Sequence, residues 1–293
     1  MPFFPAWAKL NLGLEVGARR PDGYHEIRSI MQTVSLADQV KLEWTTGSIS
    51  LEVEGADLPA DSGNIAMRAA KLMRDRAGGG LGVSIRLIKR IPLAAGLAGG
   101  SADAAAVLFG LNRLWDLGLS SPDLIALAAD LGSDVPFCLL GGTAYAKGRG
   151  EIVAPLPPLP PCFIVLVCSP LVVSTAWAYS MLDRDGLEQH RPVDGIDGLE
   201  AALETGNLSQ IAAGMANAFE PVVMAHFPLI GEIKEILLTA GALAAMMSGS
   251  GPTVYGLFST SKEAHAAASI LKASFITHVV QPVPVGAGRL IEE

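Results

Sequence analysis

Apolar and polar residues alternate strictly along "AKLNLGLEV", which spans residues 8–16. This alternation has the period of a β-strand, because successive side chains of a strand point to opposite faces of the sheet. One face carries Ala8, Leu10, Leu12, Leu14 and Val16, and the other carries Lys9, Asn11, Gly13 and Glu15. We therefore expect Lys9 and Asn11 to project side by side, about 6 to 7 Å apart.

The same alternation recurs in "VKLEW" (40–44), "SISLEVE" (48–54) and "VSIRLI" (83–88). The first third of the chain is thus predicted to be rich in antiparallel strands. A helix interrupts them, because "NIAMRAAKLMRDRAGGG" (64–80) has apolar residues at helical spacing and ends in glycines suited to a C-cap.

A second helical stripe follows residue 103. It consists of Ala104, Val107, Leu108, Leu111, Leu114 and Trp115, and Gly118 is expected to end that helix. A shorter helix is predicted to begin at "SSPD" (120–123), where a serine can cap it ahead of Pro122, and to close at Gly132.

The proline-rich segment "APLPPLPPC" (154–162) is predicted to be a linker. We place a domain boundary there, with residues 1–155 and 156–293 as two domains. Beyond it, "FIVLVC" (163–168) has the continuous apolar character of a central strand. Helices are expected across about residues 197–245, followed by strands at "TVYGLF" (253–258) and "HVVQPV" (278–283).

Composition limits the kinds of ligand and environment. The 293 residues are 50% hydrophobic, enough for a sizeable core, and the net charge of −8 provides no field that would attract nucleic acid or an anionic membrane. Two long segments, residues 152–182 and 236–261, carry no charge, but their prolines and glycines argue against a membrane span. We expect no nucleic-acid partner and no membrane partner, so an anionic ligand must be held by local groups.

The three cysteines, Cys138, Cys162 and Cys168, form no CxxC pair and lie in apolar stretches. Cysteine in such a context usually behaves as a small buried hydrophobe. Together with an N-terminus that has no secretory or transit pattern, this predicts a cytoplasmic protein.

The segment "IPLAAGLAGGSADAAA" (91–106) places three glycines directly before a predicted helix. A helix start leaves backbone N–H groups without partners and carries about half a positive charge, so phosphate satisfies both. Gly96, Gly99 and Gly100 allow a close approach, and Ser101 offers a hydroxyl. A flexible turn before an alanine-rich packing helix is the alternative. No GK[ST], GxGxxG or GxSxG pattern is present.

Together with its preceding proline, this segment resembles the PxxxGLxxSxA signature of the GHMP kinases. Two further segments match in the same order, the strand of residues 8–16 and "MMSGSGPTVYGLF" (246–258). Within that superfamily, "KLNLGLEVGARRPDGYHEI" (9–27) and "LGSDVPFCLLGGTAYAKGRGE" (131–151) resemble the 4-diphosphocytidyl-2-C-methyl-D-erythritol kinases.

The resemblance implies an α+β, two-domain GHMP kinase fold, with an N-terminal domain like domain 2 of ribosomal protein S5 and a ferredoxin-like C-terminal domain. It also implies phosphorylation, with ATP and Mg²⁺, of the 2-hydroxyl of a cytidine diphosphate-linked methylerythritol in non-mevalonate isoprenoid synthesis. Lys9 and Asp134 match the catalytic pair. Asp134 would accept the hydroxyl proton or only orient the hydroxyl.

The resemblance also assigns residues to the two ligands. The ATP-binding residues would be Asn64, Lys89, Pro92, Gly96, Leu97, Ala98, Gly99, Gly100 and Ser101, with Ser101 also on the metal side. The substrate-binding residues would be Asn11, Tyr24, His25, Thr175, Tyr179, Gly249 and Ser250, with cytidine between the rings of Tyr24 and Tyr179 and read by His25. Many relatives have glycine at the position of Ala98 and serine at that of Ala102, which argues against a positive φ at Ala98 and removes one phosphate or magnesium contact.

Other interpretations remain for the single residues. Unaided by the resemblance, Asp134 reads as a helix cap, Lys9 as a solvated strand lysine and Tyr24 as a turn aromatic that covers the core. For the whole chain, the alternatives are another GHMP small-alcohol kinase, of the mevalonate or homoserine type, and a catalytically inactive nucleotide-binding regulator. The protein is expected to be a monomer or a homodimer.

Overall fold

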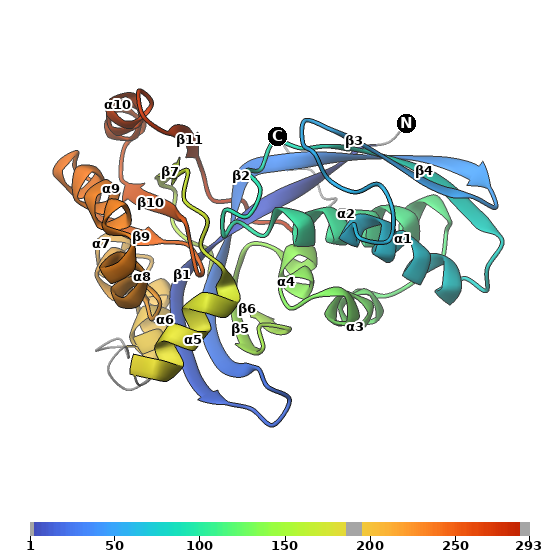
Figure 1. Cartoon of the computed structure of the whole chain (residues 1–293), viewed down its shortest axis with the longest axis horizontal. Coiled ribbons are helices and arrows are strands. Elements are labelled where there is room, and N and C mark those ends of the chain that lie inside the picture. Colours follow the sequence, from blue (N-terminus) through green and yellow to red (C-terminus); the bar gives the residue numbers. More distant parts are fainter. Residues whose placement is uncertain (1–2, 186–194, 288–293) are drawn as a thin grey trace.

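The computed structural model describes residues 3–185 and 195–287. Within them, the first half of the chain and one short strand of the second half form a sheet of seven strands (Figure 1). Its order is β3-β4-β2-β1-β8, and β5 and β6 extend it beside β2. The strands are β1 (Phe3–Arg19), β2 (His25–Thr46), β3 (Ile49–Glu54), β4 (Leu81–Ile88), β5 (Thr143–Gly148), β6 (Ile152–Pro155) and β8 (Ala216–Asn217). The strands predicted from alternation are confirmed.

Two strand pairs of this sheet are parallel, which the sequence did not predict. β3 runs parallel to β4 because the first helix crosses over between them, and the short β8 runs parallel to β1. The other pairs of the sheet are antiparallel.

Three helices pack on this sheet, α1 (Ile65–Arg76), α2 (Gly99–Leu114) and α4 (Val135–Leu140), and α3 (Ser121–Leu131) packs on these helices. The fit is tight where α2 meets β1 and β2, because a Cβ at Gly110 would lie 2.5 Å from Leu42 and 2.9 Å from Phe4. The α3 boundaries are as predicted, from the Ser120 cap to Gly132. The α2 helix, however, ends at Leu114 with Trp115 as its C-cap, and Gly118 lies beyond the turn of residues 115–116.

The second half of the chain forms, within the described residues, a sheet of four antiparallel strands in the order β11-β7-β10-β9. The strands are β7 (Phe163–Cys168), β9 (Ala244–Met247), β10 (Thr253–Phe258) and β11 (Ile276–Val280). The helices of this half are α5 (Thr175–Asp185), α6 (Gly195–Thr205), α7 (Leu208–Gly214), α8 (Glu220–His226), α9 (Pro228–Thr239) and α10 (Ser261–Leu271). The strand order is that of a ferredoxin-like sheet, as predicted.

The long strands β1 and β2 run between the two groups of helices (Figure 1). Leu10 and Leu12 of β1 join Leu166 and Tyr255 of the second sheet in one buried cluster, and the Tyr255 hydroxyl donates to the Asn11 carbonyl at 2.7 Å. The opposite face of β1 is buried as well, since Lys9 is 5% exposed and Asn11 2%.

The chain returns to the first half near its end. Backbone hydrogen bonds join Val283 to Thr33 and Ala287 to Cys138. The division at residue 155 stays a prediction, since residues beyond it also contribute to the first sheet. None of the described helices is long and apolar enough to cross a membrane.

Candidate active site

A cleft of about 510 Å³ lies where the two halves meet. Its walls come from β1, from the segment 91–98 with the start of α2, from Asp134, from α5 and from the turn at residues 249–250. The predicted site residues that line it are Lys9, Asn11, Tyr24, Lys89, Pro92, Gly96, Leu97, Ala98, Gly99, Gly100, Ser101, Asp134, Thr175, Tyr179, Gly249 and Ser250. The structure thus brings together residues that are up to 241 positions apart, from Lys9 to Ser250.

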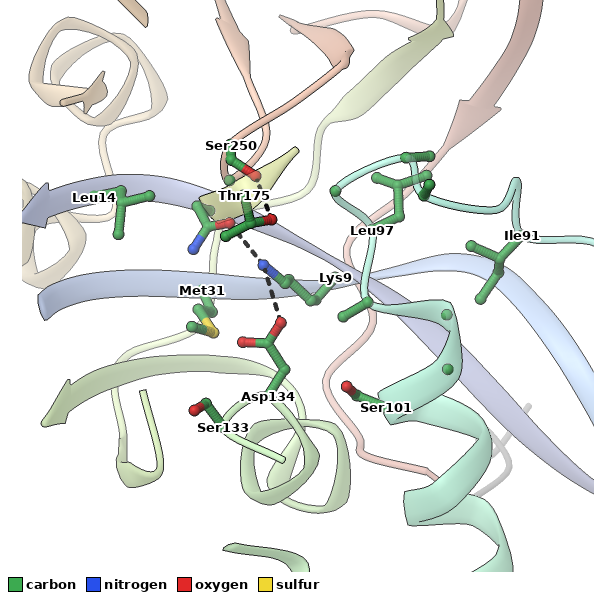
Figure 2. Close-up of a pocket in the computed structure, with 18 of the residues that line it drawn as sticks. Lys9, Leu14, Met31, Ile91, Leu97, Ser101, Ser133, Asp134, Thr175 and Ser250 are labelled. Atoms are coloured by element: carbon green, nitrogen blue, oxygen red, sulfur yellow. Dashed lines mark hydrogen bonds and ion pairs between the residues drawn. The ribbon is translucent and has the colours of Figure 1, made fainter. Parts of the chain in front are cut away.

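Lys9 and Asp134 face each other in this cleft (Figure 2), with Nζ of Lys9 3.7 Å from Oδ2 of Asp134. The Lys9 ammonium also donates to Oδ1 of Asn11 at 2.8 Å, and Asn11 donates to Ser29 at 2.8 Å. The Lys9 side chain is 6% exposed and that of Asp134 33%. Lys9 is therefore a held, buried cation rather than a solvated one, and the carboxylate it faces remains accessible.

Asp134 occupies the N-cap position of α4, but its side chain makes no capping hydrogen bond. The interpretation of this residue as an ordinary helix cap is therefore wrong. Its carboxylate is directed instead toward Lys9, and Ser101 at the start of α2 points into the same space (Figure 2).

The glycine loop leads into α2 without a side-chain cap at the helix start. Ala98, the N-cap residue, has φ 55° and ψ 32°, so the expectation that the backbone at this alanine does not adopt a positive φ is wrong. The left-handed conformation costs about 1 to 2 kcal/mol for a residue with a Cβ, and the loop retains it. The first backbone N–H groups of α2 are left available to an anion at the edge of the cleft.

Gly96 is required by its surroundings as well as by its φ of 74°. A Cβ there would lie 2.4 Å from the carbonyl oxygen of Ser248, and the Ser248 hydroxyl donates to the Gly96 carbonyl at 3.0 Å. The glycine loop is thus held against the turn that precedes β10.

Lys89 forms a buried ion triplet beside the glycine loop. Its Nζ donates to Asp38 and, at 2.6 Å, to Asp103 of α2. Although burial lowers the pKa of Lys89, the charges of Asp103 and Asp38 raise it more, so it lies above its ordinary value. Asp38 also accepts backbone N–H bonds from Arg90 at 2.5 Å and Ile91 at 2.8 Å. The triplet therefore ties the entry of the loop to α2.

Asn64 lies outside the cleft, although the resemblance assigned it to ATP. Its side chain caps α1 by accepting from the Ala66 N–H at 3.0 Å, and it donates to the Pro59 carbonyl at 3.0 Å. The structure thus uses both polar ends of this buried amide within the chain.

The aromatic residues predicted for cytidine are arranged differently from a simple sandwich. Tyr179 is stacked on His25, with ring centroids 4.9 Å apart and an interplanar angle of 16°, and Phe219 meets Tyr179 edge-on. Burial, and to a lesser extent the Asp134 charge, raise the pKa of Tyr179 to about 12. Tyr24 is 55% exposed, so the interpretation that it covers the core is wrong.

Two hydrogen-bonded pairs fix the far wall. Thr175 and Ser250 share a hydrogen bond of 2.9 Å between their hydroxyls (Figure 2). The Asn217 amide donates to the carbonyls of Met247 and Gly249, each at 2.8 Å. The predicted glycine turn at residues 248–252 is therefore held by residues from two separate segments, and a Cβ at Gly249 would lie 3.9 Å from Nζ of Lys9.

Several residues of the site were missed from the sequence. Arg149 and Ser133 line the cleft. Both are polar residues inside the segment 131–151 that carried the resemblance, and this position was the signal that could have identified them. Asp183 bonds to Nε2 of His25 at 2.8 Å, and Phe219 lines the cleft beside Tyr179. These two carry no local pattern that marks them.

Comparison with known proteins agrees with this geometry. The profile of the GHMP kinases N terminal domain matches residues 64–142, and that of the GHMP kinases C terminal matches residues 199–277. A 4-diphosphocytidyl-2-C-methyl-D-erythritol kinase of Pelotomaculum thermopropionicum is 49% identical over 253 residues, covering 86% of this chain and 87% of that protein. The chain belongs to the GHMP kinase family.

Other GHMP kinases resemble the chain over nearly its whole length. A kinase of the same name from Acetivibrio thermocellus is 43% identical and covers 94% of this chain and 98% of its own. A crystal structure of a 4-(cytidine 5'-diphospho)-2C-methyl-D-erythritol kinase superposes with a TM-score of 0.80 at 36% identity, covering 96% of this chain and 98% of that one. A homoserine kinase from Cytophaga hutchinsonii, at 21% identity and a TM-score of 0.77 with coverage of 98% and 96%, shares the fold. The predicted α+β GHMP kinase fold is confirmed.

Proposed function

We propose that this GHMP kinase transfers the γ-phosphoryl group of ATP to the 2-hydroxyl of 4-diphosphocytidyl-2-C-methyl-D-erythritol, a step of non-mevalonate isoprenoid precursor synthesis. The relatives that are 43–49% identical over most of the chain are named 4-diphosphocytidyl-2-C-methyl-D-erythritol kinase. The observation that carries the chemistry is the pair Lys9–Asp134, at 3.7 Å, in the cleft onto which the start of α2 opens.

In the proposed reaction, the 2-hydroxyl oxygen attacks the γ-phosphorus of ATP as the bond from that phosphorus to the β,γ-bridging oxygen breaks, and ADP leaves. Such transfers pass through a loose transition state, so the enzyme contributes mainly positioning and charge stabilisation. Asp134 accepts the hydroxyl proton, and Lys9, whose Nζ lies 3.7 Å from that carboxylate, offsets negative charge near the acceptor oxygen.

The ATP phosphates are proposed to lie against Gly96, Gly99, Gly100 and Ser101, where the backbone N–H groups at the start of α2 face the cleft. Ala98 contributes by its left-handed backbone, which leads the chain into the helix. Pro92 and Leu97 line the same wall. Lys89 acts by holding the loop, because its own charge is bound to Asp38 and Asp103.

Mg²⁺ is proposed as the metal that accompanies ATP. It is usually held by one or two side chains together with substrate phosphates, so a group of protein ligands is not required. Within the described residues no group of three or more His, Cys, Asp or Glu could hold a metal ion, whereas the Ser101 hydroxyl and the Asp134 carboxylate both face the cleft and fit this sparse mode of binding. When bound, the ion offsets charge on the transferred phosphoryl group.

The acceptor is proposed to bind across the cleft, with cytidine at Tyr24, His25 and Tyr179 and the erythritol unit at Asn11, Asp134, Thr175 and the turn of Gly249 and Ser250. An aromatic platform is what a nucleoside base requires, because each base has a face that stacks on a ring. A small alcohol such as mevalonate or homoserine has no base to place there.

A coupled ADP-release assay with four acceptors tests this function. Turnover is expected with the cytidine diphosphate-linked methylerythritol, and little or none with methylerythritol 4-phosphate, mevalonate or homoserine. Comparable turnover of mevalonate or homoserine would overturn the substrate assignment in favour of another GHMP kinase activity. ATP binding without turnover of any acceptor would instead indicate an inactive regulator.

A further inference from the structure

The proposed acceptor carries a diphosphate between cytidine and methylerythritol, and no residue has yet been assigned to it. The cations that line the cleft within the described residues are Lys9, Lys89 and Arg149. Lys9 is engaged at the Asp134 end, and the side chain of Lys89 is 2% exposed between two carboxylates. This leaves Arg149 as the lining cation with a charge available to a second anionic ligand.

Arg149 lies in the turn between β5 and β6, flanked by Gly148 and Gly150, both of positive φ. Its Cζ lies 5.1 Å from the centroid of the Tyr24 ring. The next residue, Gly150, approaches the other end of the cleft, because a Cβ there would lie 3.6 Å from Cβ of Ser133, the neighbour of Asp134. The turn therefore joins the aromatic end of the cleft to the catalytic end.

The guanidinium of Arg149 is only loosely paired within the chain. Its Nε is 3.6 Å from Oε1 of Glu151, longer than the roughly 2.7 to 2.9 Å of a charge-assisted hydrogen bond. The other carboxylate oxygen of Glu151 accepts the backbone N–H of Arg149 at 2.6 Å instead. The structure shows no hydrogen bond from this guanidinium to another described residue, and the side chain is 33% exposed.

We propose that the Arg149 guanidinium binds the diphosphate of the acceptor and so makes the enzyme select an acceptor that carries one. The inference rests on the proposed function. A planar guanidinium offers two parallel donors that match phosphate oxygens, and its contact with Tyr24 restricts it before the substrate arrives. A cytidine base at Tyr24 and a hydroxyl at Asp134 leave the diphosphate beside the turn that carries Arg149.

The test compares the wild-type protein with Arg149→Met, which keeps the length of the stem and removes the charge. We expect the KM for the diphosphate acceptor to rise about 10-fold or more, with the KM for ATP unchanged. Inhibition by cytidine diphosphate should weaken by a similar factor, whereas inhibition by cytidine should not change. Lys147→Met is the matched control, because Lys147 is an exposed cation two residues away on β5.

Three results would count against the proposal. An unchanged acceptor KM in Arg149→Met excludes a diphosphate contact. If inhibition by cytidine and inhibition by cytidine diphosphate weaken equally, Arg149 acts through the base. Recovery of full affinity in Arg149→Gln shows that the charge is not required. If Arg149→Met lowers the melting temperature, Arg149→Lys and Arg149→Gln are compared instead. Arg149→Lys is expected to retain more affinity for the diphosphate acceptor than Arg149→Gln. A wild-type protein that does not turn over the acceptor refutes the proposed function instead.

Discussion

The ring of Tyr179 lies on the imidazole of His25, with centroids 4.9 Å apart, and Asp183 on the same helix as Tyr179 bonds to Nε2 of that imidazole at 2.8 Å. Helix α5 therefore holds the histidine from two directions. One face of Tyr179 is covered by His25, and its edge contact with Phe219 fixes the ring further. His25, Tyr179 and Phe219 thus form one packed aromatic platform, whereas Tyr24, also predicted for cytidine, is 55% exposed.

Replacing Tyr179 tests this platform. Tyr179→Ala should raise the acceptor KM by about 5- to 150-fold, because the loss of one stacking ring costs about 1 to 3 kcal/mol, and Tyr179→Phe should stay close to wild type. The KM for ATP should not move in either variant. The control is Trp177→Phe, on the same helix but packed against His226 and Phe227. Equal acceptor KM values for Tyr179→Ala and Trp177→Phe would contradict a binding role.

The catalytic pair predicts a loss of turnover with retained binding. Asp134→Asn should lower kcat by about 10²-fold or more, because the variant cannot accept the hydroxyl proton, while the Kd of ATP stays within about 3-fold. Asp130→Asn, an exposed carboxylate four residues earlier, is the matched control and should be fully active. Nearly intact turnover in Asp134→Asn would show that Asp134 only orients the hydroxyl.

Gly96 is expected to be more sensitive to alanine than another glycine of the same φ. Gly96 and Gly47 both have φ 74°, but a Cβ at Gly96 meets the Ser248 carbonyl at 2.4 Å, whereas nothing lies within 4 Å of one at Gly47. Gly47→Ala should cost about 1 to 2 kcal/mol of unfolding free energy from backbone strain alone, measured in urea. Gly96→Ala should cost more and should also raise the KM for ATP. Equal costs would show that the loop yields without strain.

The buried triplet predicts a pH dependence of stability. Burial raises the pKa of Asp103 well above its ordinary value, more than the charge of Lys89 lowers it, and Oδ1 of Asp103 has no hydrogen-bond partner among the described residues. The native state therefore binds this proton more tightly than the unfolded state does, so the contribution of Asp103 to stability falls as the pH rises from about 4 through the raised pKa. Urea unfolding from pH 4 upward measures it.

Variants of the two carboxylates separate their roles. Asp103→Asn should remove this pH-dependent contribution, because the amide does not titrate and its oxygen can still accept the Lys89 hydrogen bond. Asp38→Asn should be the more destabilising variant and should lower the free energy of unfolding by about 3 kcal/mol. The reason is that the Asp38 carboxylate accepts hydrogen bonds from Lys89 and from two backbone N–H groups. A larger loss in Asp103→Asn than in Asp38→Asn would reverse this assignment of charge.

The sequence predicts the local elements well because their signals are local. The alternation of residues 8–16 and the Ser120 cap depend on side chains a few positions apart, and both were recovered. The parallel pairing of β3 with β4 was missed although the strand–helix–strand order of residues 48–88 favours it, because the period-2 alternation of each strand by itself favours antiparallel pairing.

The site divides in the same way. Lys9, Asp134 and the glycine loop were named from motifs, and they meet in the cleft. The surroundings of Lys89 were not foreseen, because Asp38 and Asp103 lie 51 and 14 positions away. Asn64 directly precedes a predicted helix, which favours a capping role, but the resemblance assigned it to ATP instead.

The return of residues 281–287 to the first half of the chain has a practical consequence. Ala287 donates to the Cys138 carbonyl at 2.6 Å, and Gly286 lies so close to α4 that a Cβ there would be 2.0 Å from the Leu139 carbonyl oxygen. A protein shortened after residue 280 would keep every group named for the chemistry and yet lose the support of the six-residue helix that begins beside Asp134. Removal of residues 281–287 is therefore expected to lower turnover by loosening α4, although none of these residues belongs to the catalytic pair or the glycine loop.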